Sequence, residues 1–111
     1  MLNISFDTTE LKKRCCEYAV AETVYGALNA RALLTALADA EAMENAADWI
    51  KFLGEEVAVQ EDCSLMLAFG SDSFARLIPV GTKFEKEDDG TVKWQTVRYL
   101  KLVQIGTDTD G

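Results

Sequence analysis

Two kinds of hydrophobic spacing divide the chain into a helical first half and a strand-rich second half. Between residues 9 and 53, apolar residues recur every three or four positions, which is typical of amphipathic helices. This spacing predicts a long helix over Thr9–Tyr25, a second over Leu28–Met43 and a short one over Ala46–Leu53. Gly26 follows the first helix where a left-handed cap or bend is expected, and Gly54 ends the third. Because almost nothing separates the first two helices, we expect an antiparallel helical hairpin.

The second half has the short apolar blocks and turn residues that are typical of strands. Strands are predicted at Met1–Phe6, Cys63–Phe69, Phe74–Val80 and Val92–Ile105, and the polar tail from Gly106 to Gly111 is expected to fray. Helices first and strands after indicate an α+β fold. We expect one domain over residues 1–111, an N-terminal αα-hairpin packed on one face of a small antiparallel β-sheet, and an open opposite face.

The composition of the chain indicates the class of protein to which it belongs. The chain has 111 residues, of which 49% are hydrophobic and 27% charged, as in an ordinary globular domain. It has no apolar run near the roughly 20 residues of a membrane span and no basic, apolar start like a secretion signal. We therefore expect a cytoplasmic protein with no membrane partner.

The chain contains few residues that could bind a metal ion or act as a nucleophile. The chain has no histidine, and its three cysteines, Cys15, Cys16 and Cys63, form no Cys-x-x-Cys pair. We expect no metal site and no cofactor, and we interpret the cysteines as small apolar residues in a reducing compartment. The absence of histidine also excludes every histidine-based triad.

Charge is distributed unevenly along the chain. The net charge is −8, which for the whole molecule argues against an anionic partner. Residues 1–62 hold 12 acidic and 5 basic residues, whereas residues 63–111 hold 7 and 6. Three bases, Lys93, Arg98 and Lys101, lie between Thr91 and Thr107 with no acid among them. The strand-rich half is therefore where an anion-binding surface is expected.

Several short motifs occur in an order that resembles a known family. They are Cys16-Glu17, Tyr25-Gly26, the segment Arg31–Ala42, Ala46-Ala47-Asp48, Arg76-Leu77-Ile78 and Gly90-x-x-x-Trp94. Together they resemble the RelE/ParE superfamily of toxins, and within it the HigB-like branch of plasmid maintenance killer proteins. The resemblance implies a helix pair against a small sheet, a cognate antitoxin as partner, and cleavage of messenger RNA on the translating ribosome.

The same resemblance implies a role for Arg76, which matches the arginine of the family's Arg-Leu-Ile-Phe strand. Pro79 stands where that motif has phenylalanine. The family's terminal Asp-Tyr-His falls near Thr107-Asp108-Thr109, where tyrosine and histidine are both missing. These departures concern catalysis more than the fold.

Arg76 is the central candidate for chemistry. Its planar guanidinium suits a phosphate group, and the alternative is an arginine on the open sheet face paired with a carboxylate. Arg98, Tyr99 and Lys101 complete the candidate catalytic set, as a second cation or as aids to proton transfer. Alternation places Arg98 on one face of its strand and Tyr99 and Lys101 on the other, and leaves open which face meets Arg76.

Candidate RNA-binding residues flank this set. Lys83 and Lys93 supply positive charge, and Trp94 could stack on a base. Trp49 lies in an apolar helical segment and is interpreted as a core residue.

Three functions remain open on these grounds. The first is a toxin that cleaves messenger RNA on the ribosome. The second is a non-catalytic binding module on the same fold, either a decayed toxin or a protein that grips a protein partner. The third is a gyrase poison of the ParE kind, which needs no RNA chemistry.

Overall fold

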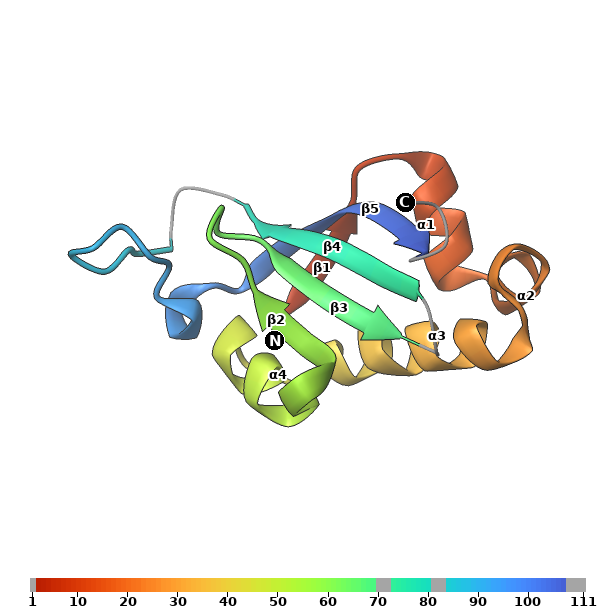
Figure 1. The fold of residues 1–111 in the computed structure, drawn as a ribbon, viewed down its shortest axis with the longest axis horizontal. Helices are drawn as coiled ribbons and strands as arrows, with labels where there is room; N and C mark the ends of the chain where they lie inside the picture. The colour runs from red at the N-terminus through yellow and green to blue at the C-terminus, as the bar shows by residue number, and fades with distance from the viewer. Residues whose placement is uncertain (1, 70–72, 81–83, 108–111) are drawn as a thin grey trace.

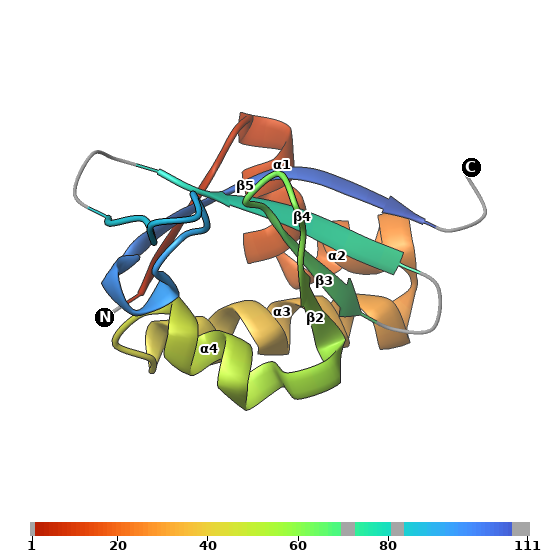
Figure 2. The same ribbon diagram turned by 60° about the vertical axis from the view of Figure 1, so that its left-hand side comes forward.

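The computed structural model describes residues 2–69, 73–80 and 84–107, and it has an α+β fold (Figure 1). Its described residues form four α-helices and a five-stranded sheet with strand order β1-β5-β4-β3-β2. In the turned view of Figure 2, α3 and α4 lie below the sheet, and most of the last strand, β5, lies along the side away from them. The predicted α+β class is confirmed.

The sheet is mixed, which corrects the prediction of an antiparallel sheet. The strands are β1 (Asn3–Phe6), β2 (Val57–Val59), β3 (Leu65–Phe69), β4 (Ser73–Pro79) and β5 (Tyr99–Thr107). β2, β3, β4 and β5 pair antiparallel in that order, but β1 pairs parallel with β5 at the edge of the sheet. Nearly the whole chain separates β1 from β5, so no hairpin fixes their relative direction.

The predicted set of strands needs two further corrections. β2 was missed because Val57-Ala58-Val59 is too short to show an alternating pattern. β5 begins at Tyr99 and extends to Thr107, so it includes Gly106 of the predicted tail and excludes Val92. The preceding segment instead makes an isolated bridge between Lys86 and Val92 and one turn of 3-10 helix, η2 (Trp94–Thr96).

The expected helical hairpin is in fact three helices. The first predicted helix breaks at Glu17, which has extended backbone angles of φ −113° and ψ 108°, and so gives α1 (Thr9–Cys16) and α2 (Tyr18–Tyr25). α3 (Ala27–Glu41) follows directly, with Gly26 at φ 90° between α2 and α3, as the glycine prediction required.

The short helix has the predicted bounds. α4 (Ala46–Leu53) is capped by the side chain of Asn45, which accepts a hydrogen bond from the backbone N–H of Asp48. Gly54, at φ 60°, ends it and leads through the 3-10 turn η1 (Gly54–Glu56) into β2. None of the helices in the described residues is long and apolar enough to cross a membrane.

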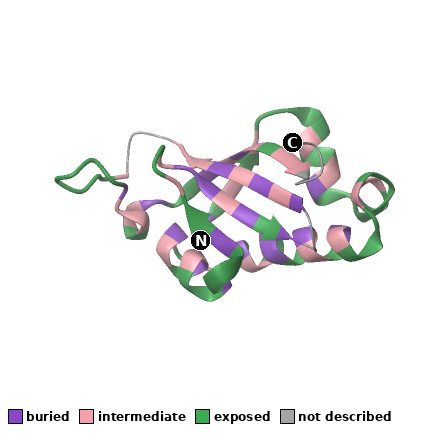
Figure 3. Ribbon diagram, viewed as in Figure 1, coloured by how far each residue is buried: buried purple, intermediate pink, exposed green. Residues whose placement is uncertain are grey.

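One hydrophobic core lies between the helices and a single face of the sheet. Leu33 of α3, Trp49 of α4 and Leu77 and Leu102 of the sheet are all fully buried in it. The prediction that Trp49 is a core residue is therefore confirmed. Figure 3 shows the consequence along β4, where buried and intermediate residues alternate. Phe74, Arg76 and Ile78 belong to the opposite sheet face, which we call the uncovered face.

Candidate functional site

The uncovered face carries three of the four candidate catalytic residues. Along β4, Ala75 and Leu77 are buried in the core, so Arg76 and Ile78 point to the other face. Ile78 pairs with Lys101 of β5, which places Lys101 on that same face, with Tyr99 two residues before it. The register therefore answers the question that alternation left open: Tyr99 and Lys101, not Arg98, share the face of Arg76.

Arg76 is held by a carboxylate of the same chain. Its guanidinium Nη2 forms an ion pair and hydrogen bond with Oδ2 of Asp62, in the turn between β2 and β3. The other oxygen of Asp62 accepts hydrogen bonds from Ser64, from the backbone N–H at 3.2 Å and from Oγ at 2.6 Å. Asp62 is therefore oriented by its own turn, and of the two interpretations of Arg76 this geometry matches the paired one.

Lys101 is paired in the same way. Its Nζ lies 3.2 Å from Oδ1 of Asp7, which follows β1. Asp7 is fixed by its backbone N–H, which donates to the carbonyl of Leu102 at 3.0 Å. Each of the two candidate cations of the uncovered face thus has a carboxylate within ion-pairing distance, and the four charges sum to zero.

Apolar side chains surround these ion pairs. Phe74 lies over Gly106 on the neighbouring strand: a Cβ added to Gly106 would be 2.9 Å from the tip of the Phe74 ring. Ile78 is half-buried, and the Tyr99 side chain is 52% exposed. The uncovered face is therefore aromatic and apolar with internally balanced charge.

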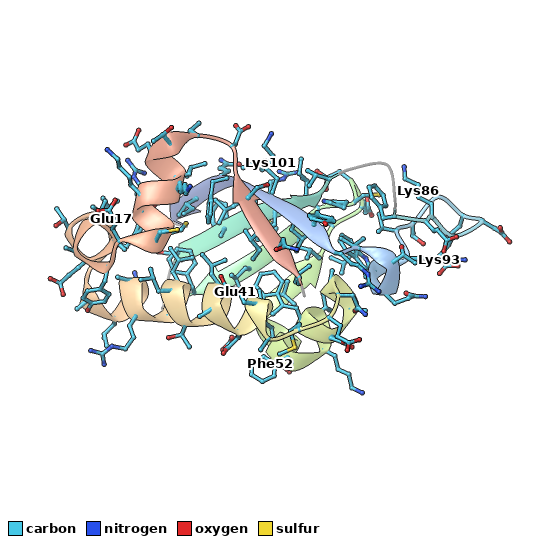
Figure 4. The ribbon with its side chains drawn as sticks, turned by 180° about the vertical axis from the view of Figure 1, so that it is seen from behind. Glu17, Glu41, Phe52, Lys86, Lys93 and Lys101 are labelled. Atoms are coloured by element: carbon cyan, nitrogen blue, oxygen red, sulfur yellow. The ribbon has the colours of Figure 1, made fainter. Side chains whose placement is uncertain are left out.

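The remaining site candidates lie elsewhere. Arg98 is exposed, and its carbonyl accepts the backbone N–H of Asn3 at the edge strand. Lys93 is half-buried beside η2, where its backbone N–H donates to the carbonyl of Glu85. Figure 4 shows Lys93 near that turn and Lys101 well apart from it on β5. Lys93 and Lys101 therefore do not belong to one cluster.

Trp94 does not strengthen an RNA site. Trp94 is half-buried and packs against the core, so its ring is only partly available to a base. Lys83 and Asp108 lie outside the described residues. Sequence reasoning missed Asp7 and Asp62, the two carboxylates that hold the cations, since each lies in a loop at least 14 residues from its partner.

The cysteines differ in accessibility. Cys15 is buried and Cys16 is exposed, and among the described residues no group of three or more histidine, cysteine or carboxylate side chains is placed to hold a metal ion. Burial raises the pKa of the Cys15 thiol from 9.0 to about 12. Cys15 is therefore a protonated thiol at neutral pH.

We expect iodoacetamide to alkylate Cys16 in the folded protein and to reach Cys15 only after unfolding, because the thiolate is the reactive form.

The raised pKa of Cys15 has a second consequence, for the stability of the protein at alkaline pH. The folded state keeps the Cys15 proton that the unfolded state loses above pH 9, so stability is full below pH 9 and falls as pH rises toward about 12. Mass spectrometry of the labelled peptides and alkaline unfolding curves check both statements. In Cys15→Ala the alkaline loss should shrink and in Cys16→Ala it should not; equal labelling of both thiols would contradict this account.

Comparison of the chain with protein-family models, with curated proteins and with solved structures gives no match. The likeness to the RelE/ParE toxins therefore rests on the sequence motifs alone.

Proposed function

We propose that this chain is a non-catalytic protein-binding module of the RelE/ParE type, with the antitoxin implied by the sequence resemblance as its partner. The observation that carries the proposal is the pairing of Arg76 with Asp62 and of Lys101 with Asp7 on the uncovered face. A surface that binds RNA gains affinity from cations that phosphates neutralise. On the uncovered face, Asp62 and Asp7 of the same chain already neutralise Arg76 and Lys101.

The free energies of the ion pairs support the same conclusion. An exposed ion pair is worth only about 0 to 1 kcal/mol, so a phosphate could displace Asp62 from Arg76 locally. Displacement leaves an unpaired carboxylate next to the phosphate, however, on a molecule whose net charge is −8. The favourable contact is therefore offset by repulsion at short and long range.

The rest of the uncovered face suits a protein. Aromatic side chains such as Phe74 and Tyr99 are typical anchors of protein–protein interfaces, and charges that are balanced before binding lower the electrostatic cost of covering them. Tyr99 is exposed and so available to such a partner.

A second candidate function is the ribosome-dependent mRNA endonuclease. One observation favours it: Arg76, Tyr99 and Lys101 lie on one face of two adjacent strands. In that mechanism a cation would neutralise the phosphate and another group would assist transfer of the 2′-hydroxyl proton.

Expression of the protein in growing bacteria separates the two functions. We expect wild type and Arg76→Ala to slow growth equally little and to leave transcripts uncut, as mapped by sequencing of RNA 5′ ends. Arg76→Ala should stay folded, because loss of an exposed ion pair costs about 1 kcal/mol or less. Growth arrest with cut transcripts that disappears in Arg76→Ala would overturn the proposal in favour of the endonuclease.

A further inference from the structure

The two most exposed large hydrophobic side chains of the described residues line the same groove. Leu28 at the start of α3 is 81% exposed and Phe52 near the end of α4 is 60% exposed. Both line a groove of about 480 Å³ between these helices. Figure 4 shows Phe52 standing out from α4 into solvent. Apolar side chains that gather at a hollow in this way mark a binding surface.

The floor and walls of the groove suit a helix. Ala32 and Ala36 of α3 also line the groove, and their small side chains let a backbone approach closely there. A second hollow of about 230 Å³ shares Ala32, Ala36 and Glu56 with the first and continues the groove to Phe69 of β3. From Leu28 to Asp39, α3 rises about 16 Å, which matches about three turns of a partner helix.

The groove is held open by a buried contact. The indole Nε1–H of Trp49 donates to the carbonyl of Ala36 at 3.1 Å, and Trp49 is completely buried. This contact fixes α4 against α3 just beneath the groove. A partner therefore meets a preformed surface and does not need to order it.

Charge determines the chemistry of the occupant. Asp39, Glu55 and Glu56 line the two hollows, against a single base, Arg31. None of these three carboxylates forms an ion pair with a residue that the structure describes. Unlike the carboxylates of the uncovered sheet face, they are available to cations of another molecule. An RNA would be repelled, and a second copy of this acidic chain would bring like charge to the same rim.

We infer that the groove binds an amphipathic helix of a partner protein, with apolar side chains toward Leu28 and Phe52 and lysine or arginine toward Asp39, Glu55 and Glu56. This is the helix-in-groove mode of recognition, with a basic flank on the helix. The inference rests on the proposed function as a protein-binding module and names both a surface and the class of partner. The groove is distinct from the uncovered sheet face.

A pair of synthetic peptides tests the inference. One is a helical peptide of about four turns with leucine on one face and lysine on the other, and the second has the same composition in scrambled order, without an apolar face. Binding to the full chain is measured by calorimetry, and the contact residues are mapped by amide chemical shifts. We expect the amphipathic peptide to bind at least tenfold more tightly, with shifts at α3 and α4.

Matched variants distinguish the groove from general attraction of a cation to an acidic protein. Leu28→Ser and Phe52→Ser should each weaken binding of the amphipathic peptide about tenfold or more, because each loses apolar area buried in the complex. Val24→Ser, which changes an exposed apolar residue outside the groove, should have no effect. Glu56→Lys should weaken binding and reduce its dependence on salt.

Four results would overturn the inference, and one would overturn the proposed function. Equal affinity for the two peptides, or shifts that map away from α3 and α4, would show charge attraction only. Self-association of wild type that Phe52→Ser abolishes, measured by light scattering, would identify a second copy as the occupant. RNA cleavage in the expression assay would overturn the proposed function, whereas failure of the peptide with uncut RNA would overturn this inference alone.

Discussion

Replacement of Trp49 by alanine is expected to lower the free energy of unfolding by about 3 to 5 kcal/mol. Trp49 is fully buried between α3, α4 and the sheet, so its removal leaves a large cavity. It also leaves the carbonyl of Ala36 without the indole N–H that now donates to it. Urea unfolding followed by circular dichroism measures the change.

Two variants sharpen this prediction. Trp49→Phe keeps most of the apolar volume and loses the hydrogen bond, so it should cost clearly less than Trp49→Ala. Phe52→Ala, on the same helix but 60% exposed, should change stability by about 0.5 kcal/mol or less. A loss below 1 kcal/mol for Trp49→Ala would show that α4 is not docked as described.

Leu102→Ala is expected to have the second largest effect, about 2 to 5 kcal/mol. Leu102 is fully buried on β5, where it pairs with Phe6 of the parallel edge strand and with Leu77 of β4. The substitution therefore creates a cavity where three strands meet. Thermal and urea unfolding give the size of the effect.

Gln104→Ala is the matched control, because Gln104 lies on the same strand and is exposed. It should change stability by about 0.5 kcal/mol or less. A larger loss for Gln104→Ala than for Leu102→Ala would mean that β5 presents the wrong face to the core, as a one-residue shift in register would produce.

Local signals in the sequence were sufficient for some elements. α4 has its predicted bounds because a capping asparagine precedes it and Gly54 follows it. The break at Gly26 was predictable for the same reason, since glycine adopts the required positive φ without strain. In β3 and β4 the alternation of buried and less buried side chains follows from the two-residue period of a strand.

Other features depend on contacts between distant segments. The helix break at Glu17 has no glycine or proline to mark it, and it allows α2 to place Tyr25 edge-on against Phe69 of β3, at 5.9 Å between ring centroids. The parallel pairing of β1 with β5 likewise joins the two ends of the chain. Neither arrangement follows from local periodicity.

The candidate site was predicted in part for the same reason. Residue types marked Arg76 and Lys101 as cations on strands, but their partners Asp62 and Asp7 lie in loops whose positions only the tertiary structure determines. The turn of Asp62 is the one sequence signal available, because Ser64 two residues later suits an Asx-type hydrogen bond. Charge counts alone could not show that these cations are neutralised.

The salt dependence of RNA binding tests most directly whether carboxylates neutralise the uncovered face. Binding of a labelled single-stranded RNA to wild type, Arg76→Ala and Asp62→Asn is measured from about 50 to about 200 mM salt. We predict weak binding with almost no salt dependence for wild type and Arg76→Ala. Asp62→Asn frees Arg76 and should steepen the slope of log K against log salt by about 0.7. A steep slope in wild type that Arg76→Ala removes would contradict the account.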